Sequence, residues 1–201
     1  MAGVLLAGVL CGRSAEARAT QPARLDERDL RLELGLGYMD DEHMGEGAYL
    51  HLLGLLRHGY AQGGLVTDLS TQVFGGNRGF VGAGIGPVWR ADSGLRLDAL
   101  AAFGVVAYSG VGCGLFCRSG GASLLARHAQ LRASVGYAFG ARRRFVLSAG
   151  SVIGTSPERE VSYETVTVGL FSDETSQNQH SATLGGESAA FLLGFGGVFG
   201  L

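Results

Sequence analysis

Two short stretches of the chain hold residue types that could do chemistry. The first lies near the C-terminal end and contains a base and nucleophiles close together: His180, Ser181, Glu187 and Ser188. A serine nucleophile needs a base within hydrogen-bond reach, and the base needs an orienting partner, so this set suggests a hydrolytic site. The deacylase-like order His-x-Ser-Asn is absent, because the chain reads Asn-Gln-His-Ser here. We therefore expect no catalytic residues and no enzymatic activity.

The second stretch is acidic and runs Asp40-Asp41-Glu42-His43. Its carboxylates are hard oxygen ligands of the kind that divalent cations take. Consecutive residues rarely converge on one ion, so we interpret the stretch as a solvated loop. The glycine string at 82, 84 and 86 is no phosphate loop, because it lacks a following helix and a lysine. The sequence thus predicts no metal and no cofactor.

Composition points to a membrane protein that crosses with strands. The 201 residues suit one domain, and 46% of them are apolar, yet no apolar run reaches the ~20 residues of a spanning helix. A barrel strand needs only ~9–11 residues with one apolar face. A net charge of −2, with no basic cluster larger than Arg142–Arg144, argues against nucleic acid as a partner.

The N-terminal segment resembles an export signal. Residues 1–19 hold a short apolar core and end in Ala17-Arg18-Ala19, which matches an Ala-x-Ala cleavage site. Lipidation at Cys11 is the weaker alternative, because bulky Leu10 precedes it. The predicted organisation is a signal peptide at 1–19, a periplasmic linker at 20–29 and a β-barrel at 30–201.

Cleavage of that signal leaves two cysteines, Cys113 and Cys117. An even pair in an exported chain predicts a disulfide, here a staple across a tight glycine-rich loop. Two free thiols are the alternative.

Alternation with a period of two residues recurs along the chain. In 30–38 the odd members are charged or glycine and the even members are apolar, without exception. Similar alternation predicts eight strands in all, at 30–38, 47–57, 65–73, 80–89, 95–108, 125–139, 145–154 and 181–199. The fold class is therefore all-β, an eight-stranded antiparallel up-and-down transmembrane β-barrel.

The connections fall into two classes that alternate along the chain. The connections of the first class, at 58–64, 90–94 and 140–144, are short. The second class contains longer connections at 39–46, 109–121 and 155–180, and one short connection at 75–79. Short turns at one end and longer loops at the other are typical of outer-membrane barrels, with both termini in the periplasm. The strand-like segment 161–171 would break the even number, so we place it in an extracellular extension of strands seven and eight.

The apolar face is expected to meet lipid, because the polar face is too poor in charge for a water-exposed surface. Aromatic residues with lipid-face parity gather beside the short turns and predict an interfacial girdle: Trp89, Tyr137, Phe139, Phe145 and Phe199. The isolated polar residues then face a narrow lumen: Arg31, Glu33, Asp68, Arg96, Asp98, His128, Gln130 and Arg132. Buried charges must pair, so they predict an Arg–carboxylate network that plugs the lumen.

The terminal strand carries the pattern Phe191-x-Leu193-x-Phe195, then Phe199 two places before the final Leu201. With the strand count and the turn asymmetry, it makes the chain resemble the small outer-membrane barrels of the OmpA-domain and OmpX/Ail type. The resemblance implies a bacterial outer-membrane location, folding by the barrel assembly machinery, contact with outer-membrane lipids and lipopolysaccharide, and a role in envelope integrity, adhesion or surface interaction. A lipid A-modifying barrel enzyme and a soluble periplasmic lipid-binding barrel, with its apolar face inward, are the alternatives.

Overall fold

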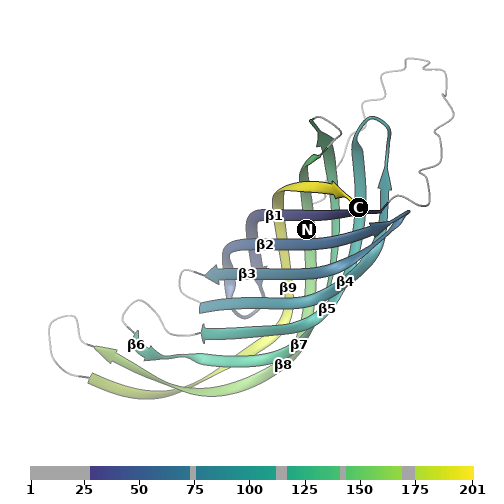
Figure 1. Cartoon of the computed structure of the whole chain (residues 1–201). Helices are drawn as coiled ribbons and strands as arrows, with labels where there is room; N and C mark the ends of the chain where they lie inside the picture. Colours follow the sequence, from purple (N-terminus) through teal and green to yellow (C-terminus); the bar gives the residue numbers. More distant parts are fainter. Residues whose placement is uncertain (1–27, 73–75, 112–116, 141–143, 169–174) are drawn as a thin grey trace, which may run out of the picture.

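The computed structural model describes residues 28–72, 76–111, 117–140, 144–168 and 175–201, and these residues form β-strands joined by turns (Figure 1). The strands are β1 (Arg28–Asp41), β2 (Gly45–His58), β3 (Ala61–Gln72), β4 (Gly76–Arg90), β5 (Leu95–Val111), β6 (Cys117–Gly120), β7 (Ala122–Phe139), β8 (Phe145–Val168) and β9 (Thr175–Gly200). In the described part of the chain no helix is long and apolar enough to cross a membrane.

Eight long strands close into an antiparallel barrel. The sheet order is β8-β7-β5-β4-β3-β2-β1-β9, and β8 also pairs with β9. The seam between the first and last strands is continuous, from Asp29 opposite Gly200 to Asp41 opposite Ser188. The short β6 lies outside the barrel and pairs with the distal part of β8. The predicted fold class, an all-β eight-stranded antiparallel up-and-down barrel, is confirmed.

Four strands, β1, β2, β4 and β9, extend beyond their predicted bounds at both ends. β1 starts at Arg28, so the last two residues of the predicted linker 20–29 belong to the barrel. The predicted loop 39–46 is mostly paired strand with a three-residue turn at 42–44. Asp41 explains the tight turn, because its carboxylate accepts the backbone N–H groups of His43 and Met44, both at 3.3 Å. The predicted signal peptide 1–19 and linker residues 20–27 lie outside the described residues.

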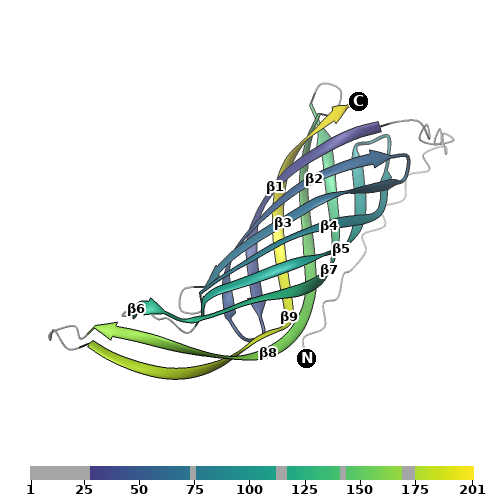
Figure 2. The same ribbon diagram turned by 60° about the horizontal axis from the view of Figure 1, so that its bottom comes forward.

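β8 and β9 continue past the other strands as a two-stranded ribbon, at the end of the barrel away from the C-terminus (Figures 1 and 2). Their pairing runs out to Val168 opposite Thr175. The predicted long connection 155–180 is therefore largely ordered strand. The segment predicted to extend strands seven and eight does so over residues 161–168, and residues 169–171 lie outside the described part.

A bulge marks the point where the ribbon leaves the barrel. The register between β8 and β9 shifts between Ser156 and Arg159. Opposite this shift, Gly185 and Gly186 have φ of +106° and +79°, which favour glycine. A Cβ on Gly185 would lie 2.4 Å from the carbonyl oxygen of Pro157, so a side chain there would force the two strands apart. The two glycines thus permit the close crossing of β8 and β9.

The two faces of the barrel are inverted relative to a water-soluble protein. Arg31 is 1% exposed and its neighbour Glu33 is 3% exposed, while Leu34 beside them is 48% exposed. Burial alternates in the same way along the barrel part of each long strand, and most of the large side chains that face outward are apolar or aromatic. A lipid-binding barrel with its apolar face inward requires the opposite parity. The structure therefore contradicts that alternative.

The seam between β1 and β9 predicts that Gly37→Ala destabilises the barrel. A Cβ on Gly37 would lie 1.9 Å from the carbonyl oxygen of Phe191, so the closing strands would have to separate. We expect a loss of about 1–3 kcal/mol in the free energy of unfolding, measured by urea titration of the refolded protein in detergent micelles. In the control Gly54→Ala, the nearest atom to the new Cβ is a Leu32 methyl at 3.7 Å. The free energy of unfolding of this variant should equal that of the wild type. Equal stability of the two variants would contradict this account of the seam.

Candidate functional site

The interior of the barrel holds a balanced set of charges. Among the described residues, five arginines and five carboxylates are buried: Arg31, Arg57, Arg78, Arg96, Arg132, Asp29, Glu33, Asp41, Asp68 and Asp98. Buried charges are tolerated when each is paired and hydrogen-bonded. The structure places all seven residues predicted to form the lumen network on this inner face, as well as Gln130.

Glu33 on β1 receives donors from three other positions. Arg31 and Arg132 both form ion pairs with its carboxylate, and Ser148 Oγ donates a hydrogen bond at 2.9 Å. Space for this cluster comes from β9, where a Cβ on Gly194 would lie 2.6 Å from Glu33 Oε1. The contacts join β1, β7 and β8 across the lumen.

Asp98 on β5 extends the network toward the short-turn end. It accepts hydrogen bonds from Arg31 at 2.9 Å, from Arg96 Nε at 3.2 Å and from Ser134 Oγ at 2.9 Å. Arg96 reaches further, and its second amino group donates to Gln62 Oε1 at 2.6 Å. Arg31 therefore bridges two carboxylates, and a chain of charge-assisted hydrogen bonds crosses the interior.

His51 on β2 forms a second branch. It is fully buried and lies between the Asp68 carboxylate and the Arg132 guanidinium, in contact with both. The hydroxyl group of Tyr49 lies 3.3 Å from the same ring. Its parity within β2 was the available signal, because it matches the polar face of that strand.

A cluster at the short-turn end was missed from the sequence. Arg57 and Arg90 both pair with Asp29, at 2.8 Å and 3.0 Å. Asp29 was assigned to the linker, so its place on the inner face of β1 went unnoticed. Arg57 lies on β2 with the same parity as His51, and that spacing was sufficient to find it.

Arg78 organises the end nearer the ribbon and was also missed. It lies 3.7 Å from Asp41 and 2.8 Å from His128 Nε2, and it donates to Ser188 Oγ at 3.4 Å. His128 also packs edge-on against Phe80, with ring centroids 5.2 Å apart. The sequence placed residue 78 in a turn, whereas β4 already begins at Gly76 and carries Arg78 inward.

Apolar side chains fill the rest of the interior around these charges. One buried cluster lines the wall made by β2 to β5 and comprises Leu53, Leu55, Val66, Phe80, Leu100 and Ala102. Another closes the end where the ribbon emerges and comprises Met44, Val106, Tyr108, Val111, Ala122 and Leu184. Charged and apolar side chains thus both point into the interior of the described barrel.

The predicted aromatic girdle residues all lie on the outer face. Trp89, Tyr137, Phe139, Phe145 and Phe199 are exposed. Phe145 links part of this set, because its ring lies 5.8 Å from that of Phe139 and stacks on Phe195 at 6.1 Å. They sit at strand ends beside the β4–β5 and β7–β8 turns and the chain terminus, where the interface of a bilayer favours aromatic rings.

The residues considered for catalysis do not converge. Ser188 lies inside the barrel beside Arg78, whereas His180 and Ser181 lie on the ribbon. His180 and Ser188 are eight positions apart on β9, a separation that spans about 27 Å in a regular strand. The His180 ring instead approaches the Thr165 hydroxyl at 3.1 Å and packs on Tyr163. No nucleophile–base pair forms from this set.

The predicted Cys113–Cys117 disulfide lies partly outside the described residues. Cys113 lies outside the described residues, and Cys117 is the first residue of β6. The disulfide therefore stays a prediction.

Comparisons with known proteins return similarity in fold only. No protein-family profile matches the chain, and no curated protein matches its sequence. The structure of neisserial surface protein A (NspA) aligns with 9% identity and a TM-score of 0.49, over 85% of this chain and 96% of that one. The β domain of the Bordetella autotransporter BrkA aligns with 11% identity and a TM-score of 0.41, over 87% and 100%. The predicted kinship with the OmpA-domain and OmpX/Ail barrels stays a prediction.

The interior network predicts a large effect of Glu33→Gln. This change removes one carboxylate charge from between two arginines and leaves both less compensated in a buried site. We expect a loss of about 3–5 kcal/mol in the free energy of unfolding, measured by urea titration in lipid vesicles. Asp92→Asn, in the exposed β4–β5 turn, is the matched control and should behave as wild type. If the two variants unfold alike, Glu33 does not hold the network together.

Proposed function

We propose that the chain is a non-enzymatic integral β-barrel of the bacterial outer membrane, which presents a β-ribbon outside the cell. The observation that carries the proposal is the inverted barrel, with ion pairs inside and a continuous apolar surface outside. Monomeric soluble proteins rarely expose contiguous apolar patches of this extent, and lipid is the medium that covers them.

The height of the apolar surface suits a bilayer. On β1 the outward side chains are apolar from Leu30 to Tyr38, and the next outward residue is Asp40, a charge. Nine residues match the ~9–11 that a membrane strand needs. The aromatic girdle lies at the short-turn end of the same band, which supports an interface at that level.

In this proposal the short turns and the first and last residues of the barrel face the periplasm, and the ribbon faces outward. Residues 1–19 would be removed on export, and the barrel assembly machinery would insert the mature chain. Strand β6, which begins at Cys117, would then lie on the ribbon side, where the oxidising envelope permits the expected disulfide with Cys113.

The ribbon supports a role in surface interaction or envelope integrity. Beyond the bulge its exposed side chains are mostly polar and carry more carboxylates than arginines: Glu158, Arg159, Glu160, Glu164, Gln179, His180 and Ser181. Such a polar, net acidic surface suits contact with a macromolecule outside the cell. The filled interior supports a structural role for the buried charges and requires no cofactor.

Membrane insertion is tested by Leu34→Arg. Leu34 lies in the middle of the outer apolar band, opposite Phe195 across the seam. In a bilayer the arginine should lower the free energy of unfolding by about 2–4 kcal/mol, measured in lipid vesicles, and should reduce the heat-modifiable band in the outer-membrane fraction. The control Leu34→Met keeps the face apolar and should fractionate as wild type. Recovery of the wild-type chain in the soluble periplasmic fraction would refute the proposal.

The filled interior predicts the absence of a stable pore. Reconstituted into a planar bilayer, the wild-type protein should give no large, long-lived conductance, because paired side chains occupy the lumen. Glu33→Ala combined with Arg132→Ala would enlarge the polar path and should raise the frequency of openings. A large and steady wild-type conductance would show that the interior is not plugged.

A further inference from the structure

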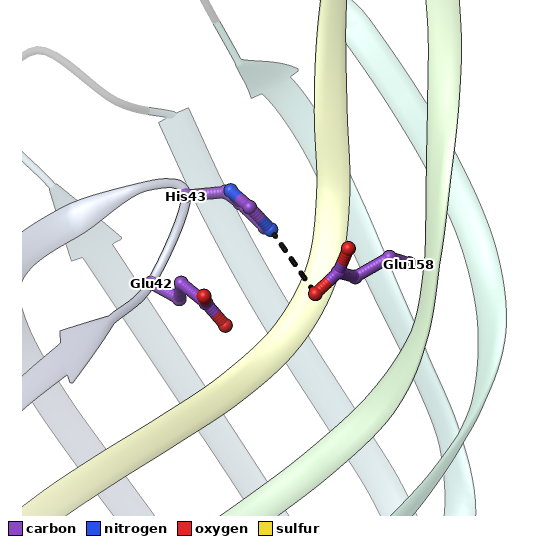
Figure 3. A group of neighbouring side chains, drawn as sticks. All are labelled: Glu42, His43 and Glu158. Carbon is purple, nitrogen blue, oxygen red and sulfur yellow. Dashed lines mark ion pairs between the residues drawn. The ribbon is translucent and has the colours of Figure 1, made fainter.

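Three side chains with metal-ligand atoms meet where the ribbon leaves the barrel (Figure 3). Glu42 and His43 lie in the turn between β1 and β2, and Glu158 lies on β8 at the bulge. More than one hundred residues separate the turn from Glu158 in the sequence. Two independent elements therefore bring an imidazole and two carboxylates to one place.

Glycine in β9 makes this meeting possible. β9 pairs with β1 on one side and with β8 on the other, so side chains from the turn reach Glu158 across β9. A Cβ on Gly186 would lie 2.5 Å from Glu42 Oε2 and 3.2 Å from His43 Nε2. Any larger residue would occupy the space into which both side chains point.

The candidate ligand atoms of these three side chains lie close together. One atom from each of the three side chains lies within 4.8 Å of the others. The backbone N–H of Glu187 donates to Glu42 Oε2 at 3.0 Å, and the Glu42 N–H donates to the Glu187 carbonyl oxygen at the same distance. These two bonds fix the turn against β9 and hold the Glu42 carboxylate beside His43.

His43 Nε2 is the least satisfied atom of the group. It is shielded from solvent and has no hydrogen-bond partner in the described part of the chain. Its separation from Glu158 Oε1 is 3.9 Å, too long for a hydrogen bond. Two ligands of a tetrahedral ion lie about 3.3 Å apart, so a small side-chain rotation would bring both atoms onto one ion.

The charge of the group differs from that of the interior. Glu33 and Asp98 of the lumen network form ion pairs with arginines, whereas no arginine of the described residues forms an ion pair with Glu42 or Glu158. Two carboxylates and an imidazole nitrogen are the nitrogen and oxygen ligands that zinc takes, while calcium prefers six to eight oxygens. We propose that Glu42, His43 and Glu158 bind a zinc-class divalent cation that clamps the β1–β2 turn to the ribbon.

The clamp has a mechanical consequence. The ion would join the barrel rim to β8 beside the register shift, where the ribbon changes direction. Small rotations of the exposed glutamate side chains bring three ligands onto the ion, and a fourth position stays open to water. The inference depends on these three side chains and holds whether or not the ribbon binds a macromolecule.

Zinc titration of the full-length, tag-free chain in detergent micelles tests the clamp. Competition with a fluorescent zinc indicator should reveal one site per chain. His43→Ala and Glu158→Gln should each weaken that site at least about tenfold. The matched controls are His58→Ala, an exposed imidazole at the opposite end of the barrel, and Glu160→Gln, an exposed carboxylate two residues along β8. Both controls should bind zinc as wild type does.

A heat-modifiable shift on electrophoresis verifies that each variant is folded before titration. The proposal is overturned if the folded wild type binds no zinc, or if His43→Ala binds as tightly as wild type. It is also overturned if His58→Ala loses as much affinity as His43→Ala, since zinc would then bind surface histidines indiscriminately. Displacement of zinc by equimolar calcium would refute the assignment of the site to a zinc-class ion.

Discussion

Charge neutrality inside a narrow barrel is the constraint on which the rest of this structure depends. Because the outer surface is apolar, the polar side chains of the strands point into the lumen. Eight strands enclose a space so narrow that side chains fill it. An isolated charge in such a space is costly, so each must find a partner across the lumen. The five buried arginines and five buried carboxylates of the described residues meet that condition.

The network in turn restricts the backbone around it. Glu33 can receive Arg31, Arg132 and Ser148 because Gly194 leaves room beside its carboxylate. Strand register is equally constrained, since a slip of one residue would turn the arginines toward the outside and the leucines toward the lumen. The seam between β1 and β9 therefore closes in a register that keeps Leu34 opposite Phe195 on the outer face.

The ribbon depends on a local interruption of the regular pairing between β8 and β9. Regular pairing of β8 and β9 would carry the barrel wall straight on, but the shift after Ser156 interrupts it. Gly185 and Gly186 adopt left-handed conformations there and let Pro157 approach closely. The absence of side chains at this crossing also brings Glu158 to His43, so one backbone irregularity both redirects the ribbon and creates a cluster of ligands.

Local alternation along the chain was sufficient to determine the number of barrel strands and the side on which most residues lie. Leu30 to Tyr38 carry this information within nine residues, because side chains of a strand point alternately to opposite faces whatever the strand pairs with. The tertiary structure alone decided the partners. Arg31 meets Asp98 from 67 positions away, Asp29 and Arg78 proved to belong to strands, and the turn at His43 met Glu158. Such contacts depend on the register between strands and on closure of the sheet, and no short stretch of sequence encodes either one.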